Sequence, residues 1–103
     1  MDSYDSIVIN ENDAISETRP VEHARKTFPW MSEFEYSALI SARMLQLHIM
    51  GHTPLVHQEI PDVMSIAKAE IDAYLPYLAI RRRFSDGSSE DWLLRDKTLV
   101  FPR

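Results

Sequence analysis

Apolar side chains recur at helical spacing over residues 32–51, and they occupy two faces rather than one. The two apolar sets are Phe34, Ala38, Ala42, Leu45 and Ile49 on one face and Tyr36, Leu39, Ile40, Met44 and Leu47 on the other. Both helix ends are also encoded. Ser32 and Glu35 have the spacing of a capping box, and Gly51 followed by Pro54 is typical of a helix end.

This central helix has more apolar surface than a small domain normally covers. A helix that is apolar on nearly every side is buried on most sides, and a chain of 103 residues can hardly surround one. We therefore expect one face to pack on the protein's own core and the other to pack on a partner. The spacing is equally compatible with a partner-free helix that has a broad apolar face in a small bundle.

A second helix is predicted over residues 62–76, with Asp62 as its N-cap and Pro76 at its end. Its apolar residues form one stripe, made by Val63, Ile66, Ala67, Ile71, Tyr74 and Leu75. Glu70 lies at the edge of this stripe, where a carboxylate is unfavourable unless it is paired. Because Arg43 is the only arginine or lysine of the central helix, we expect an Arg43–Glu70 ion pair between the helices. The alternative is that both charges are solvated.

The C-terminal part has the pattern of a β-hairpin. Residues 77–84 have strand character, residues 89–94 form the return strand, and Asp86-Gly87 between them favours a two-residue turn. Such a turn predicts three cross-strand pairs, namely Arg83 with Glu90, Arg82 with Asp91 and Arg81 with Trp92. Residues 99–101 form a last short apolar segment.

The N-terminal part is acidic and weakly patterned. Its apolar triplet, Ile7-Val8-Ile9, is too short to predict a core element. We therefore expect a flexible acidic arm over residues 1–26, followed by one domain over residues 27–103. The expected fold class is α+β, with two main helices packed against a C-terminal β-hairpin.

Composition narrows the function classes. The chain has 11 Lys and Arg residues against 16 Asp and Glu residues, and its net charge of -5 argues against a free-standing nucleic-acid binder. Cysteine is absent, which excludes disulfides and thiolate metal sites. No apolar run is long enough to span a membrane, and neither a P-loop nor a clustered acidic metal site is visible.

The histidines are the remaining candidates for chemistry. His48, His52 and His57 lie close together in the sequence with Glu59, and His48 and His52 have the spacing of a helical metal pair. However, Gly51 is expected to end the helix between them. Solvated or capping histidines are therefore favoured over a metal site, and over a small enzyme that uses His48, His57 and Glu59.

Four separated motifs resemble one known family and follow its order. The first is the lead-in Thr27–Met31 with Ser32, and the second is the helix motif Phe34-Glu35, Leu39-Ile40, Ala42-Arg43 and Gln46-Leu47. The third is the second-helix motif Ile66-Ala67, Glu70-Ile71 and Pro76. The fourth is the hairpin motif Ile80–Arg82, Asp86–Ser88 and Glu90–Trp92. These motifs resemble the omega family of RNA polymerase subunits. The closest branch is the small common subunit shared by the eukaryotic nuclear RNA polymerases, which has viral relatives. The chain departs from the pattern at Ser85, where the family usually has proline, and in its shorter acidic extension.

The resemblance implies a non-catalytic subunit of a multisubunit DNA-dependent RNA polymerase, which clamps the largest subunit and aids assembly. It implies no cofactor, metal or catalytic residue, and a location in the nucleus or, for a viral member, in the virion or the host-cell cytoplasm. The residues proposed to contact the partner are Phe34, Glu35, Tyr36, Leu39, Ile40, Arg43, Gln46, Leu47, Glu70, Arg81, Arg82 and Trp92. The alternative function is a small nucleic-acid-binding module that uses Arg81, Arg82 and Arg83.

Overall fold

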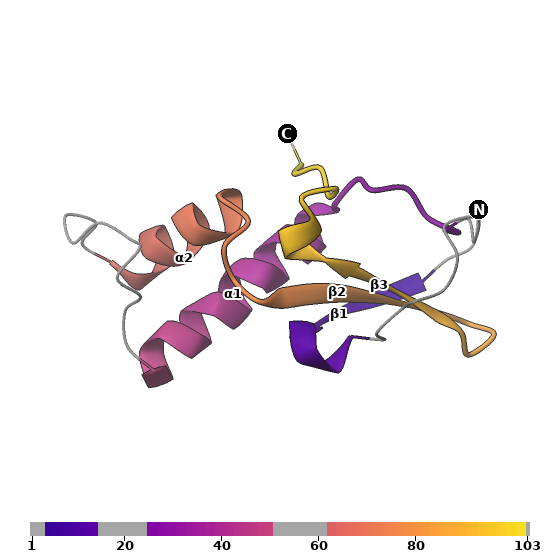
Figure 1. Ribbon diagram of the computed structural model, residues 1–103, viewed down its shortest axis with the longest axis horizontal. Coiled ribbons are helices and arrows are strands. Elements are labelled where there is room, and N and C mark those ends of the chain that lie inside the picture. The colour runs from indigo at the N-terminus through magenta and orange to yellow at the C-terminus, as the bar shows by residue number, and fades with distance from the viewer. Residues whose placement is uncertain (1–3, 15–24, 51–61, 103) are drawn as a thin grey trace.

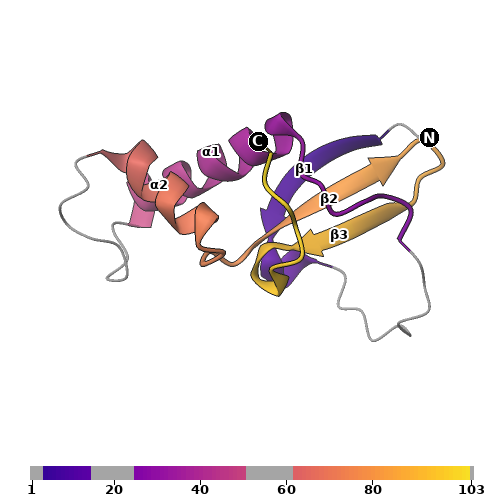
Figure 2. The same cartoon turned by 90° about the horizontal axis from the view of Figure 1, so that it is seen from above.

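The computed structural model describes residues 4–14, 25–50 and 62–102, and it has an α+β fold. Its regular elements are β1 (Tyr4–Asn10), α1 (Glu33–Met50), α2 (Val63–Asp72), β2 (Leu78–Phe84) and β3 (Ser89–Leu93), with short 3-10 turns η1 (Glu11–Asp13) and η2 (Leu94–Asp96). The strands form one antiparallel sheet in the order β1-β2-β3. Figures 1 and 2 show the two helices side by side at one end of the molecule and the sheet at the other.

The N-terminal strand β1 is a correction to the sequence analysis. Residues 4–10 pair along their whole length with β2, so they are not a free arm. Val8 packs against the core, and Asp5 lies opposite Arg83, which pairs with its carboxylate at 3.1 Å. The apolar triplet was too short to predict a strand by itself. In the folded chain β1 is an edge strand, and it needs few apolar residues because the buried strand β2 provides its backbone hydrogen-bond partners. Residues 15–24 of the expected arm lie outside the described residues.

The predicted capping box of α1 is present with both of its bonds. The Glu35 backbone N–H donates to Ser32 Oγ at 3.0 Å, and the Ser32 backbone N–H donates to Glu35 Oε1 at 3.0 Å. These bonds satisfy backbone donors that the first helical turn leaves without an intrahelical partner. The predicted stop at Gly51 and Pro54 lies outside the described part of the chain.

The helix α2 begins as predicted but ends before Pro76. Asp62 is the N-cap and accepts from the Ser65 backbone N–H at 2.7 Å. The helix ends at Asp72, and Tyr74 adopts a left-handed conformation with φ of 58°. This backbone allows the Leu75 N–H to reach the Glu70 carbonyl at 3.1 Å, a Schellman-type helix end that usually has glycine at the left-handed position. The Tyr74 hydroxyl donates to the Leu99 carbonyl at 2.9 Å and so anchors the unusual residue.

The hairpin turn has three residues, not the two that were predicted. The Phe84 N–H donates to the Ser88 carbonyl at 2.9 Å, and the Gly87 N–H donates to the Phe84 carbonyl at 3.0 Å. Gly87 has a φ of +94°, which glycine adopts at little cost and which suits a turn followed by a left-handed residue. The extra residue shifts the predicted register by one position. The observed cross-strand pairs are Arg83 with Ser89, Arg82 with Glu90, Arg81 with Asp91 and Ile80 with Trp92.

The segment before α1 and the segment after η2 meet in a short parallel bridge between Trp30 and Val100. The Met31 N–H donates to the Val100 carbonyl at 2.8 Å, and the Val100 N–H donates to the Pro29 carbonyl at 2.9 Å. The core beneath this bridge joins one face of α1 to α2 and the sheet. Its buried members are Met31, Leu39, Ile40, Leu47, Ile66, Ala67, Ile71, Leu78, Ile80, Trp92, Leu94 and Leu99.

Candidate partner-binding surface

The helix α1 buries one of its two apolar faces and exposes the other. Leu39, Ile40 and Leu47 lie in the core. On the opposite side, Phe34, Leu45 and Ile49 have exposed fractions of 66%, 60% and 71%. We call the residues Phe34, Ala38, Ala42, Leu45 and Ile49 the outward stripe of α1. Exposed leucine, isoleucine and phenylalanine in one line indicate a surface that another molecule covers.

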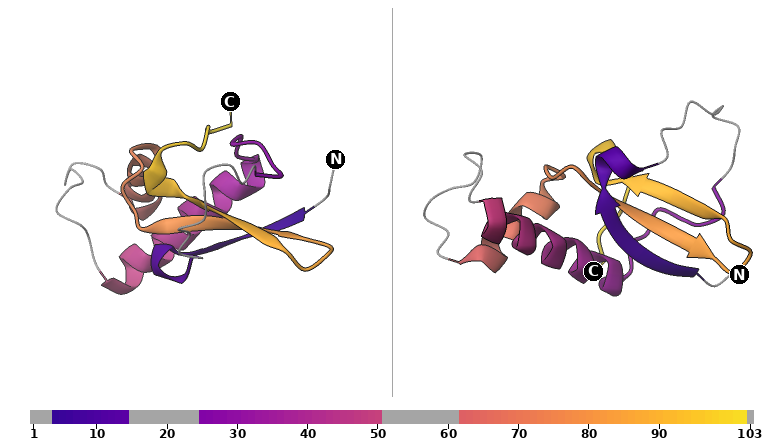
Figure 3. Two further views of the ribbon diagram at one scale, coloured as in Figure 1. Left: turned by 45° about the vertical axis from the view of Figure 1, so that its right-hand side comes forward. Right: turned by 90° about the horizontal axis from the view of Figure 1, so that it is seen from below.

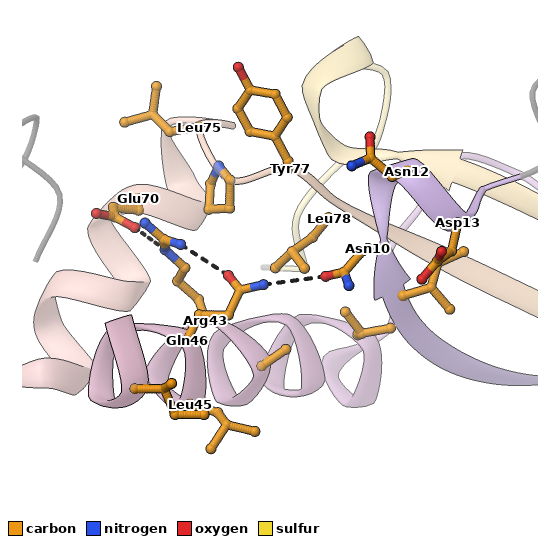
Figure 4. Close-up of a pocket in the computed structure, with 15 residues that line it drawn as sticks. Asn10, Asn12, Asp13, Arg43, Leu45, Gln46, Glu70, Leu75, Tyr77 and Leu78 are labelled. Carbon is orange, nitrogen blue, oxygen red and sulfur yellow. Dashed lines mark hydrogen bonds and ion pairs between the residues drawn. The ribbon is translucent and has the colours of Figure 1, made fainter. Parts of the chain in front are cut away.

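A groove of about 1070 Å³ lies beside the C-terminal half of the outward stripe. Its walls come from three parts of the chain, which Figure 4 shows around the opening: β1 with η1, α1, and the segment that joins α2 to β2. The apolar lining residues are Val8, Ile9, Ala42, Leu45, Ile49, Leu75, Pro76, Tyr77 and Leu78. The groove is large enough to take several side chains of a partner.

Polar side chains cross the groove in a hydrogen-bonded chain from α2 to β1 (Figure 4). Arg43 Nε donates to Glu70 Oε1, Arg43 Nη1 donates to Gln46 Oε1 at 3.0 Å, and Gln46 Nε2 approaches Asn10 Oδ1 at 3.4 Å. The predicted Arg43–Glu70 pair is therefore confirmed. Its side chains are only 11% and 1% exposed, which rules out the alternative of two solvated charges.

A second ion pair is buried completely and joins four segments. Arg82 donates to both carboxylate oxygens of Glu35, at 2.8 and 2.9 Å. Its other N–H groups donate to Thr27 Oγ1 at 2.8 Å and to the carbonyls of Phe28 and Trp30 at 2.6 and 3.0 Å. These five bonds match the five N–H donors of a guanidinium group. The pair therefore ties α1 and β2 to the lead-in segment that precedes α1.

The Glu35 carboxylate is stabilised in its charged form. Burial alone would raise the pKa of Glu35, but hydrogen bonds from Arg82, Ser6 and the Ser32 backbone, together with the charge of Arg82, hold the pKa below its usual value. Ser6 belongs to β1 and donates to Glu35 Oε2 at 2.6 Å, so the pair also anchors the N-terminal strand.

The other two arginines of the triplet also face carboxylates rather than an open groove. Arg81 forms two hydrogen bonds with Asp91, at 2.8 and 3.0 Å, and Arg83 forms two with Asp5, at 3.1 and 3.2 Å. Arg82 is the buried partner of Glu35. The predicted pairs of Arg83 with Glu90, of Arg82 with Asp91 and of Arg81 with Trp92 are wrong, because they depended on the two-residue turn. The triplet thus offers no free basic surface for nucleic acid.

The structure separates the predicted partner-binding residues into two groups. Phe34 is exposed, and Tyr36, Arg43, Gln46 and Arg81 are partly exposed. The buried group comprises Glu35, Leu39, Ile40, Leu47, Glu70, Arg82 and Trp92, whose side chains hold the protein together. Contact of either group with a partner stays a prediction.

Leu45 and Ile49 are two of the most exposed apolar residues, but they were not among the predicted binding residues. The signal was present, because both share helical spacing with Phe34. Of the candidate metal ligands, His48 is exposed, while His52, His57 and Glu59 lie outside the described residues. Within the described ranges, no helix is both long and apolar enough to cross a membrane.

Comparison with known proteins supports the resemblance found in the motifs. No family model matches the chain. The chain is 29% identical over 94 residues to the DNA-directed RNA polymerases II and V subunit 6B of Arabidopsis thaliana. The match covers 82% of this chain and 65% of the plant protein, so it spans somewhat less than two thirds of that relative.

Proposed function

We propose that this chain, a distant relative of the omega-family RNA polymerase subunits, is a non-catalytic architectural subunit of a multisubunit DNA-dependent RNA polymerase. In this role it clamps the largest subunit and aids assembly of the complex. The proposal includes a nuclear location or, for a viral polymerase, the virion or the host-cell cytoplasm.

The observation that carries the proposal is the outward stripe of α1. Three large apolar side chains on one helix face, Phe34, Leu45 and Ile49, are each more than half exposed. The same helix holds one of the four motifs that resemble the polymerase subunit. A helix that fixes one apolar face in its own core and presents the other is suited to a stable assembly, because burial of the second face stabilises the complex.

The alternative of a nucleic-acid-binding module has less support. A protein that binds nucleic acid through phosphate contacts needs basic side chains that are free to reach phosphates. Arg81, Arg82 and Arg83 are each engaged with a carboxylate, and Arg82 has no exposed surface. The net charge of -5 argues in the same direction.

Native co-purification tests the proposal. A tagged chain expressed in its natural cell is isolated at moderate salt, and bound proteins are identified by mass spectrometry. We expect the large polymerase subunits to be recovered. The double variant Leu45→Ser/Ile49→Ser should reduce their recovery at least about tenfold, because two apolar contacts of roughly 1.5–3 kcal/mol each are lost.

The matched control is Met64→Ser. Met64 is an apolar residue of α2 that is 59% exposed, and it lies outside both the outward stripe and the lining of the groove. This variant should recover the polymerase as well as the unchanged chain does. Recovery of no polymerase subunit with the unchanged chain, or equal recovery with Leu45→Ser/Ile49→Ser, would contradict the proposal.

A further inference from the structure

One edge of the strand β1 has no neighbouring strand within the described part of the chain. The alternation of hydrogen-bonded pairs between β1 and β2 shows which backbone groups face that edge. The Glu11 N–H donates to the Tyr77 carbonyl at 2.9 Å, and these two residues continue the register of the β1–β2 ladder. Hydrogen-bonded pairs alternate along an antiparallel ladder. Asp5, Ile7 and Ile9 therefore direct their backbone groups towards β2.

The residues between them direct their backbone groups the opposite way. Ser6, Val8 and Asn10 turn their N–H and C=O groups away from β2, towards the side where β1 is the last strand of the sheet. Figure 3, in the view from below, shows β1 along this border. Over residues 4–14, 25–50 and 62–102, no backbone group bonds to these outward groups. Such a row of donors and acceptors is a template for another strand.

The unpaired edge and the groove share residues. Val8, Ile9 and Asn10 belong to β1 and also line the groove, which Ala42, Leu45 and Ile49 of the outward stripe line as well. A strand added to β1 would therefore have backbone partners along one side and apolar pockets for alternate side chains beside it. Proteins commonly bind extended peptides in this way, with main-chain bonds giving affinity and side-chain pockets giving specificity.

The acidic charge of the N-terminal segment favours some kinds of chain over others as the partner of this edge. Residues 1–17 contain Asp2, Asp5, Glu11, Asp13 and Glu17 but no lysine, arginine or histidine. Two copies of β1 placed edge to edge would bring Asp5, Glu11 and Asp13 of the two copies towards each other. Asp5 and Glu11 are partly compensated by Arg83 and Arg95, and the remaining repulsion disfavours pairing of the chain with itself. An extended segment with alternating apolar residues and flanking lysine or arginine fits both the groove and the charge.

We propose that β1 accepts an extended, basic-flanked segment of a polymerase subunit as an additional strand of the sheet. This inference rests on the proposed function, because it assigns a binding mode to the same assembly. The added strand pairs with the outward groups of Ser6, Val8 and Asn10, and its side chains on one face enter the groove beside Leu45 and Ile49.

Hydrogen exchange at single-residue resolution tests this binding mode directly. The isolated chain and the chain within the purified polymerase complex are compared. We expect the amides of Ser6 and Val8 to exchange quickly in the isolated chain and to become at least about tenfold slower in the complex. The amides of Ile7 and Ile9, which already donate to β2, should be protected in both states. Fast exchange of Ser6 and Val8 within an intact complex would overturn the inference while leaving the proposed function standing.

A pair of proline variants gives a second test. Val8→Pro removes an outward N–H of β1 while sparing the ladder to β2, since proline is tolerated on edge strands when its missing N–H faces outward. Ser89→Pro does the same on β3, at the other edge of the sheet. We expect Val8→Pro to weaken recovery of the complex roughly fivefold, and Ser89→Pro to leave it unchanged. Equal recovery with both variants, when both keep the melting temperature of the unchanged chain, would also overturn the inference.

Discussion

Arg82 is fully buried, yet the described structure supplies an acceptor for each of its N–H groups. A buried ion pair contributes little net stability compared with apolar residues of the same volume, because both charges lose their hydration. What the pair supplies is specificity. We expect a packing that displaces β2, α1 or the lead-in segment to leave the buried guanidinium group without some of these partners.

Glu35→Gln tests this account at the scale of one residue. The change keeps the shape of the side chain but leaves Arg82 as an uncompensated buried charge. We expect the free energy of unfolding near neutral pH to fall by about 3–5 kcal/mol, measured by urea denaturation. The matched control is Asp5→Asn, which removes the exposed partner of Arg83 and should cost at most about 1 kcal/mol.

The pH dependence of the same variant has a definite sign. Because the pKa of Glu35 is lower in the folded chain than its ordinary value of 4.5, the ionised group stabilises the folded state above that pH. This stabilisation is lost as the pH falls through the folded-state pKa. The difference in unfolding free energy between the unchanged chain and Glu35→Gln should therefore be constant from pH 7 down to about 5 and shrink below 4.5. A difference that does not depend on pH would refute the charged role of Glu35.

At the scale of elements, the two helices are held together by polar contacts as well as by their apolar faces. The Arg43–Glu70 pair joins α1 to α2 beneath the groove, and Lys68, Tyr36 and Asp72 form a second, exposed link between the same helices. The two links differ in burial, so their contributions to stability should differ too.

Arg43→Ala should destabilise the protein by about 3–5 kcal/mol, because it removes a cation that hydrogen-bonds to the buried Glu70 carboxylate. It should also impair assembly with the proposed polymerase partner, since Arg43 lines the groove. Lys68→Ala is the control and should change both quantities little, because Lys68 is an exposed residue of α2. Thermal melting and native co-purification measure the two effects, and similar small effects of both variants would contradict the role assigned to Arg43.

The sequence predicted those features that depend on neighbouring residues. The capping box of α1, the N-cap of α2 and the partnership of Arg43 with Glu70 all follow from helical spacing and were correct. The predicted register of the hairpin was wrong, because the turn has one more residue than predicted and this residue shifts every cross-strand pair. The burial of Arg82 had a signal that was missed, since Ile80, Arg82 and Phe84 alternate on one face of β2. The strand β1 had only the short triplet Ile7-Val8-Ile9 as a signal, and its partner β2 lies far away in the sequence.

At the scale of the whole molecule, the sheet and the helices share one core, while Phe34, Leu45 and Ile49 of the outward stripe stay exposed outside it. That division could be predicted only in part. Periodicity identified two apolar faces on α1, but which face is inside depends on where α2 and the sheet pack. Small domains bury a limited share of their surface, so an open apolar helix face leaves little margin of stability.

The isolated chain should therefore be marginally stable and prone to aggregate, and binding to the largest polymerase subunit should stabilise it. A partner present at a hundred times its Kd adds about 2.7 kcal/mol to the free energy of unfolding. Differential scanning calorimetry of the chain, alone and with the partner, measures this as a rise in Tm. An isolated chain with a sharp melt at high temperature, and no binding of a hydrophobic dye, would count against this expectation.

The bridge between Trp30 and Val100 also determines how the chain reaches its folded state. It joins segments that are far apart in the sequence, and such contacts form only after a long loop has been closed. Proteins dominated by distant contacts fold slowly, because the entropy of closure is lost before the contact compensates it. The bridge is therefore expected to form late, together with the burial of Met31 and Leu99. Until that step, Met31 and Leu99 stay exposed in addition to the outward stripe of α1, so a chaperone or an early encounter with the proposed partner would favour productive folding.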